Sequence, residues 1–158
     1  MKQKVNLSLY CKLLTAIVSI ILLVILHYSN NLWSATTIGL ILLVWIGLAF
    51  YFMPVSVSVD DKALHINRLA KTKTIPYSEI SSITPMQPTM GEQRLFGSAG
   101  WFGYWGWFKE KDLGKYFAYY GKASDCFFVR LKNGSKYMLG CEDPQLLTSF
   151  VSHRLPTN

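Results

Sequence analysis

The sequence predicts an α+β protein in which two transmembrane helices precede a bent antiparallel sheet or barrel of about seven strands, closed by a C-terminal capping helix. Three observations predict this class. No Asp, Glu, Lys or Arg occurs in the 47 residues from Leu13 to Val59. Apolar and polar residues alternate from Val55 onward, which is typical of half-buried strands. Apolar residues recur at helical spacing after Asp143. We therefore expect a membrane hairpin over residues 1–54 and a cytosolic domain over residues 55–158.

The uncharged stretch is about twice as long as the roughly 20 apolar residues that one helix needs to cross a bilayer. Its middle, from His27 to Asn31, is polar, so two crossings joined by a turn fit better than one long helix. We expect spans over residues 13–28 and 35–53. Trp33 lies beside the turn, where aromatic rings favour the membrane interface, and Pro54 ends the second helix.

A cleaved signal peptide is the alternative interpretation of residues 1–26. No small-x-small cleavage site follows Leu26, however, and a second apolar run comes at once. Lysines precede the first span and basic residues follow the second, whereas the turn between the spans has none. Because loops rich in Lys and Arg stay in the cytoplasm, we expect both termini to be cytoplasmic.

Charge and cysteine content exclude several other classes. The formal net charge is +7, but the basic residues are scattered along the chain and form no continuous stripe. An anionic membrane surface explains this placement better than nucleic acid does, so we expect no nucleic-acid partner. The three cysteines, Cys11, Cys126 and Cys141, form no C-x-x-C pair, which argues against a disulfide framework and a zinc site. We expect buried or interfacial thiols in a reducing compartment.

The elements of the domain follow from local patterns. Residues 85–95 contain two prolines and a glycine among polar neighbours and are expected to form a loop. Asn133-Gly134 predicts a hairpin with a type I′ turn. Asp143 is a good N-cap, and Pro144 suits the first position of the last helix. The apolar face of that helix comprises Leu146, Leu147, Phe150, Val151 and Leu155. The expected strands cover residues 55–59, 63–68, 72–75, 80–83, 116–120, 126–132 and 135–139.

Several motifs give this layout a family resemblance. Ile75–Ile80 reads I-P-Y-S-E-I and resembles the I-P-Y-x-x-I segment of bacterial pleckstrin-homology-like (PH-like) domains. Arg94–Phe108 reads R-L-F-G-S-A-G-W-F-G-Y-W-G-W-F and resembles the R-x-F-G-x-x-G-x-F-G-Y-x-G-x-F signature of one bacterial PH family. Leu113–Tyr116 and Gly134–Tyr137 resemble its L-G-x-Y/F and G-x-x-Y segments, and Asp143-Pro144 resembles its D-P pair.

The resemblance covers about residues 55–155 and implies a PH-like fold in a protein of the bacterial cytoplasmic membrane. Leu139–Pro144 reads L-G-C-E-D-P and departs from the usual S-P-x-D-P, which affects only the turn before the helix. PH-like folds bind lipids, peptides or proteins, so the resemblance implies no particular ligand.

The Gly-aromatic segment is the most unusual part of the domain, with Gly97, Gly100, Gly103 and Gly106 at every third position. Three interpretations stay open: the rings complete the core, they form a surface that rests on the membrane or grips a partner helix, or they stack on bases. The candidate surface residues in this segment are Trp101, Phe102, Tyr104, Trp105 and Trp107.

Arg68, Lys71 and Lys73 form the second candidate site, because PH-like domains that bind phosphorylated headgroups place basic side chains on this pair of strands. Three interpretations of these residues stay open: a solvated edge near the membrane, a surface that weakly attracts anionic lipid, or a specific inositol-phosphate pocket. Each basic residue near an anionic surface contributes about 1 kcal/mol of binding free energy.

No motif for a nucleophile, a phosphate-binding loop, a dinucleotide or a metal occurs in the sequence. We expect no enzyme activity, cofactor or metal. The leading hypothesis is a binding or scaffolding module, anchored in the lipid bilayer, that engages a membrane-proximal protein. The alternatives are docking to anionic lipid headgroups through the basic strands and the Gly-aromatic segment, or an accessory subunit of a membrane complex.

Overall fold

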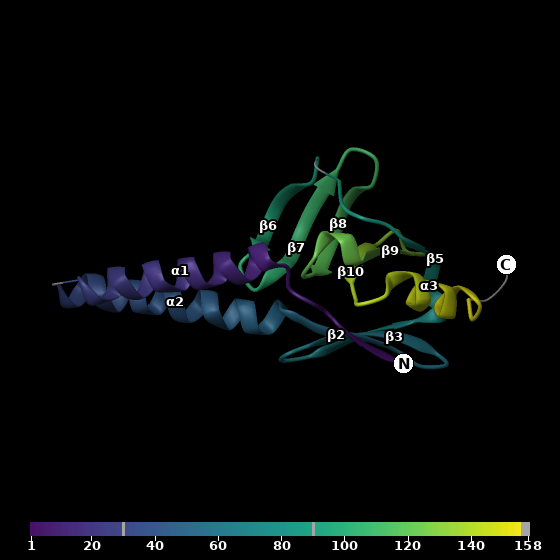
Figure 1. Ribbon diagram of the computed structural model, residues 1–158, viewed down its shortest axis with the longest axis horizontal. Coiled ribbons are helices and arrows are strands. Elements are labelled where there is room, and N and C mark those ends of the chain that lie inside the picture. The colour runs from purple at the N-terminus through teal and green to yellow at the C-terminus, as the bar shows by residue number, and fades with distance from the viewer. Residues whose placement is uncertain (30, 90, 156–158) are drawn as a thin grey trace.

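The computed structural model describes residues 1–29, 31–89 and 91–155. A pair of long helices projects from one end of a β-rich domain, and a short helix packs on that domain at its other end (Figure 1). The helices are α1 (Leu9–His27), α2 (Leu32–Phe52) and α3 (Pro144–Ser152). The strands are β1 (Lys2–Lys4), β2 (Pro54–Val59), β3 (Ala63–Arg68), β4 (Thr72–Pro76), β5 (Ile80–Pro85), β6 (Gln93–Gly100), β7 (Gly103–Glu110), β8 (Gly114–Tyr120), β9 (Cys126–Leu131) and β10 (Lys136–Gly140).

The two long helices have the length and composition of membrane spans. Their 19 and 21 residues correspond to about 28 and 32 Å, close to the thickness of a bilayer's hydrocarbon core. Nearly all of their apolar side chains are exposed, which water would not tolerate. Ser8 caps α1 by accepting from the Cys11 N–H, so this helix begins four residues earlier than predicted. Asn31 caps α2 in the same way through the Trp33 N–H.

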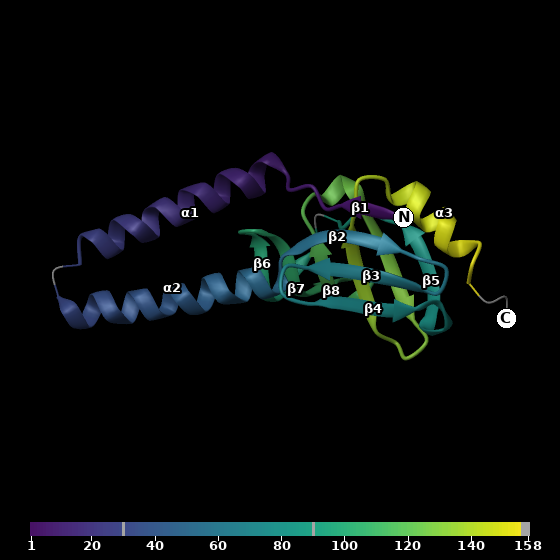
Figure 2. The same cartoon turned by 90° about the horizontal axis from the view of Figure 1, so that it is seen from below.

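The strands form two sheets. The four-stranded sheet has the order β1-β2-β3-β4, and the six-stranded sheet has the order β5-β9-β10-β8-β7-β6. All neighbours are antiparallel except β10 and β8. Strand β1 was not predicted; its Gln3 lies opposite Val57 of β2. Because β1 belongs to a sheet of the domain, the N-terminus and the domain lie at the same end of the helix pair (Figure 2).

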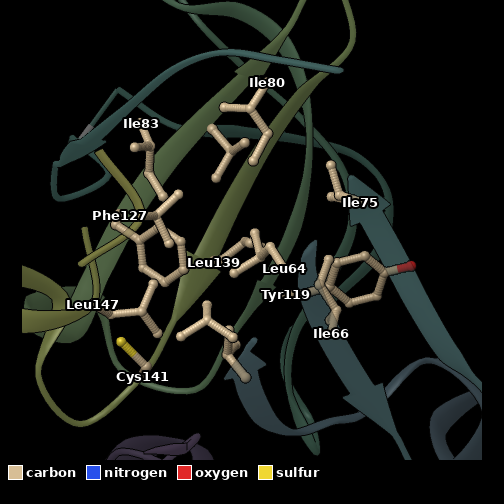
Figure 3. Close-up of a cluster of buried hydrophobic side chains, with 14 of the residues drawn as sticks. Leu64, Ile66, Ile75, Ile80, Ile83, Tyr119, Phe127, Leu139, Cys141 and Leu147 are labelled. Carbon is tan, nitrogen blue, oxygen red and sulfur yellow. The ribbon is translucent and has the colours of Figure 1, made fainter. Parts of the chain in front are cut away.

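The main core lies between the two sheets, where Leu139 of β10 lies between Leu64 of β3 and Phe127 of β9 (Figure 3). Helix α3 closes one end of this core, as predicted. Asp143 caps it by accepting from the Leu146 N–H, and Leu147 is fully buried. The predicted apolar face was wrong at Leu146, which is exposed because it lies on the solvent side of the helix.

Two local predictions need correction. In the β9–β10 turn only Gly134 has positive φ, and its N–H donates to the Leu131 carbonyl. This is the three-residue hairpin loop with a glycine bulge, not a type I′ turn. Among the described residues, nine strands follow α2 where about seven were expected, because the Gly-aromatic segment forms β6 and β7. The predicted loop at residues 85–95 is correspondingly shorter, and strand β6 already begins at Gln93.

Candidate functional site at the junction of helices and domain

The Gly-aromatic segment is a β-hairpin whose two strands come unusually close. Gly97 of β6 lies directly opposite Gly106 of β7, and both have positive φ, of 114° and 121°. A Cβ atom at Gly97 would lie 2.1 Å from the Trp105 carbonyl oxygen, and one at Gly106 would lie 2.2 Å from the Phe96 carbonyl oxygen. Only glycine fits at these two positions, for steric as well as conformational reasons.

The tip of this hairpin, Trp101-Phe102, docks on α1. Phe102 has a φ of 55° and donates its N–H to the Thr15 hydroxyl at 3.0 Å. That hydroxyl in turn donates to the Cys11 carbonyl at 2.7 Å, so one side chain serves both the helix and the hairpin. A Cβ atom at Gly100 would lie 2.8 Å from Leu14 Cδ2. The tip therefore lies directly against the first turns of α1.

Aromatic rings join the same hairpin to α2. The ring centroids of Trp101 and Trp45 are 6.0 Å apart. Trp105 stacks on Phe52 with centroids 5.5 Å apart and planes at 10°. Trp101 and Trp105 are only 9% and 2% exposed. Hence these candidate surface residues contact this chain's own helices.

The other candidate rings of the hairpin lie elsewhere. Phe102 is half-buried, with its centroid 6.2 Å from that of Phe50 in α2. Tyr104 stacks on Tyr120, with centroids 4.6 Å apart. Trp107 is the most accessible of the predicted set at 38% exposed, and the Lys115 ammonium lies 4.4 Å from its ring.

The predicted basic residues do not act as one cluster. Arg68 ends β3 beside the last turn of α2, its guanidinium 5.2 Å from the Tyr51 ring. Lys71 is exposed in the same β3–β4 turn, and its carbonyl accepts from the Arg68 Nε–H. Lys73 instead donates to the Tyr137 hydroxyl of β10 at 2.5 Å. The turn between β3 and β4 lies at the end of the sheet nearest α2 (Figure 2), so Arg68 and Lys71 lie near that helix, whereas Lys73 packs on the domain.

A buried polar network on the outer face of the six-stranded sheet was not predicted. The Tyr116 hydroxyl lies within hydrogen-bond distance of both Glu92 and Glu110, and the Tyr120 hydroxyl donates to Glu92. Burial raises the pKa of Glu92 above its ordinary value, and the neighbouring Glu110 raises it further. Glu110 also accepts from the Thr89 N–H and hydroxyl. The network holds the β5–β6 connection over this face of the sheet.

A cavity between α1 and α2 was also missed. The two helices lie close together at the loop that joins them and diverge toward the domain, where the tip of the β6–β7 hairpin approaches the space between them (Figure 2). The cavity there has a volume of about 460 Å³. Arg94 and Ser98 of β6 lie on its domain side, next to Trp101. No residue pattern predicts how far two uniformly apolar helices separate.

The titratable groups outside this network include three cysteines. Within residues 1–29, 31–89 and 91–155, no three His, Cys, Asp or Glu side chains lie close enough to hold a metal ion. The three cysteines are buried and unpaired, as the sequence predicted for buried thiols. Burial raises the pKa of the Cys141 thiol to about 12.

Two packed sheets closed by a C-terminal helix, attached to a pair of exposed apolar helices, define a PH-like domain with candidate membrane-anchoring helices. The sequence profile described as bacterial PH domain matches residues 55–155, and the chain belongs to this family. This confirms the resemblance drawn from the motifs. Searches of curated proteins and of solved structures each gave no match.

Proposed function

We propose that the protein is a membrane-anchored, non-catalytic docking module that presents its PH-like domain to a membrane-proximal protein in one fixed orientation. The observation that carries this proposal is the double attachment of the domain to the helix pair. Only Met53 separates α2 from β2. On the other side, the N-terminal segment pairs with β2, and the Ser8 N–H donates to the Gly121 carbonyl at 2.9 Å. A domain tethered by a flexible linker would need neither contact.

Strand β6 offers the most suitable docking edge. It is the last strand of the six-stranded sheet, so one side of its backbone has no neighbouring strand. Leu95 and Phe96 are 53% and 63% exposed there, beside the helix pair. Exposed edges of this kind bind extended peptide segments by adding a strand, with apolar side chains supplying specificity. An extended, apolar segment of a membrane protein fits this edge.

Site-specific photo-crosslinking tests this proposal in the full-length chain in native membranes. A photoreactive residue at Phe96 is expected to give one discrete heterologous adduct. The matched control is the same residue at Asn133, in the exposed β9–β10 turn away from the helices in Figure 2. Adducts with the chain alone, or equal adducts at both positions, would contradict the proposal. If the adduct contains several subunits, the accessory-subunit alternative is favoured.

A second candidate function is docking to anionic lipid. It is favoured by the β3–β4 turn, where Leu69 is 57% exposed between Arg68 and Lys71 and lies beside the end of α2. Two basic residues near an anionic surface contribute about 2 kcal/mol. A fluorophore on Leu69→Cys in nanodiscs should be quenched by headgroup-labelled lipid, more so with phosphatidylglycerol present. The change Lys71→Glu should reduce this difference, and quenching independent of lipid charge would contradict it.

Orientation completes the proposal: both termini are cytoplasmic. The charge asymmetry around the two spans supports it, since basic residues flank both domain-side ends and the helix–helix turn has none. A fluorescent or phosphatase reporter fused to the C-terminus and, separately, to the α1–α2 turn should report opposite compartments. The same compartment for both fusions would contradict a two-span hairpin.

A further inference from the structure

The cavity between α1 and α2 has an apolar body. Its walls are aliphatic and aromatic side chains of the two helices. The main lining residues are Val18, Leu22 and Ile25 from α1 and Ile38, Leu42 and Trp45 from α2. In a bilayer, such a space is filled by hydrocarbon, because water would find no hydrogen-bond partners on these walls.

The domain side of the same space carries unused hydrogen-bond donors. Among the described residues, no carboxylate pairs with Arg94, and no acceptor lies near the Trp101 and Trp105 indole N–H groups, which are buried. Arg94 and Trp101 line the main cavity. Arg94 and Trp105 line a smaller cavity of about 220 Å³, which continues past Trp45 and Gly97. The Arg94 guanidinium is therefore the available donor at one end of this apolar space, whereas the two indole N–H groups are covered by protein atoms.

The occupant of this space must satisfy two conditions. Its body must be apolar, because the walls between the helices are aliphatic and aromatic side chains. Its polar end must suit Arg94, since an arginine beside membrane-embedded apolar residues is usually paired. A planar guanidinium matches phosphate oxygens in bidentate geometry. The occupant therefore combines a phosphate with a hydrocarbon chain.

We propose that this space binds one anionic glycerophospholipid from the surrounding bilayer. Its acyl chain lies between α1 and α2, and its phosphate pairs with Arg94. The lipid would fill the gap that the aromatic hairpin opens between the helices. The site shares strand β6 with the proposed docking edge, since Phe96 lines its smaller cavity, but it holds a lipid rather than a protein segment and so goes beyond the function proposed above.

Native mass spectrometry of the full-length chain in mild detergent tests the proposal directly. With dioleoyl phosphatidylglycerol and dioleoyl phosphatidylcholine added at equal concentration, the wild-type chain should retain one phosphatidylglycerol about tenfold more often. Arg94→Gln should abolish that preference. Arg130→Gln is the matched control, because Arg130 is exposed on β9 and does not line the cavity.

Three further results separate the alternatives. Val18→Trp fills the cavity and should block retention while Arg94 is intact. Equal retention of the two lipids by the wild type would overturn the proposal, and this result does not depend on whether any variant folds. Unchanged preference in Arg94→Gln would overturn it as well. Competition by inorganic phosphate alone would show a free-anion site and overturn it equally. The Phe96 crosslink should persist in Arg94→Gln, so failure here is distinguishable from failure of the docking proposal.

Discussion

The two ends of the domain are both packed with large apolar side chains, but they differ in what completes them. At the α3 end, Leu64, Phe127 and Leu147 are fully buried in the core, and none of the unpaired buried side-chain atoms found in the described residues lies among them. At the helix end, Trp101 and Trp105 are also buried, yet each brings an indole N–H that has no acceptor in the described part of the chain. The domain's own sheets and α3 complete the packing at one end, whereas the membrane helices complete it at the other.

This difference shows how a small domain is coupled to a bilayer. The α3 end would stay closed if the helices were removed, because its core is made from the two sheets and α3. The helix end would expose Trp101 and Trp105, whose ring neighbours include Trp45 and Phe52 of α2. We infer that the α3 end supplies stability, whereas the helix end sets the orientation of the domain.

The largest effect is expected from a substitution that disrupts the β6–β7 hairpin at the helix end. Gly97→Ala places a methyl group 2.1 Å from the Trp105 carbonyl oxygen at a φ of 114°, so the hairpin cannot keep its geometry. We expect a loss of more than about 4 kcal/mol, at the upper end for single substitutions. Limited proteolysis in detergent should then cleave near the hairpin. Gly39→Ala in α2 is the control, because nothing lies within 4 Å of its added methyl group. A stable, protease-resistant Gly97→Ala would contradict the close strand approach.

The next largest effect is expected from a substitution that disrupts packing at the α3 end. Leu147→Ala removes a fully buried side chain and should cost about 2–4 kcal/mol, since the surrounding strands cannot close the cavity completely. Chemical denaturation followed by far-UV circular dichroism measures it. Leu146→Ala is the matched control on the same helix, because Leu146 is exposed. If both changes cost the same, the packing assigned to α3 is wrong.

The contrast between the two ends also explains which features of the structure could be predicted from the sequence. At the α3 end the signals are local: alternation predicts β3, Asn133-Gly134 marks the hairpin that contains β9, and Asp143-Pro144 predicts the start of α3. At the helix end the motif marked Trp101 and Trp105 as special without showing what they touch. Their partners lie on α2, more than 50 positions earlier in the chain, where a ring in an apolar run carries no positional signal.

Three features stayed hidden for different physical reasons. Strand β1 consists of three polar residues, so no apolar pattern marks it in the sequence. It forms because its backbone pairs with the edge of β2. Strands β6 and β7 were missed because a glycine at every third position interrupts the period of two. The cavity depends on the angle between two helices that are apolar on every side, so no face distinguishes the inside.

A smaller effect sharpens the view that α1 holds the hairpin tip. Thr15→Val preserves shape but removes the acceptor of the Phe102 N–H, and should cost about 1 kcal/mol. Amide hydrogen exchange should rise at residues 100–103 and stay unchanged in α3. Thr37→Val is the control, because the Thr37 hydroxyl bonds only within α2, to the Trp33 carbonyl. Unchanged exchange at the tip would show that the rings alone hold it.

The smallest effect concerns pH and the outer face of the six-stranded sheet. The single Tyr116 hydroxyl hydrogen cannot serve Glu92 and Glu110 at once, so a proton on Glu92 completes the network. This agrees with the direction of the Glu92 shift, since burial raises its pKa above the ordinary 4.5.

The sign of the pH dependence follows from that direction. A carboxyl whose pKa is higher in the folded state stabilises the fold fully below the unfolded pKa, and this contribution is lost as pH rises through the folded value. The thermal midpoint of the wild type should therefore fall with rising pH relative to Glu92→Gln, which resembles the protonated side chain. Melting curves from pH 4 to pH 8 measure the difference, which should be smaller than that of Thr15→Val. Glu79→Gln, at an exposed position, should run parallel to the wild type. A parallel curve for Glu92→Gln would mean that Glu92 keeps its ordinary charge in the folded protein.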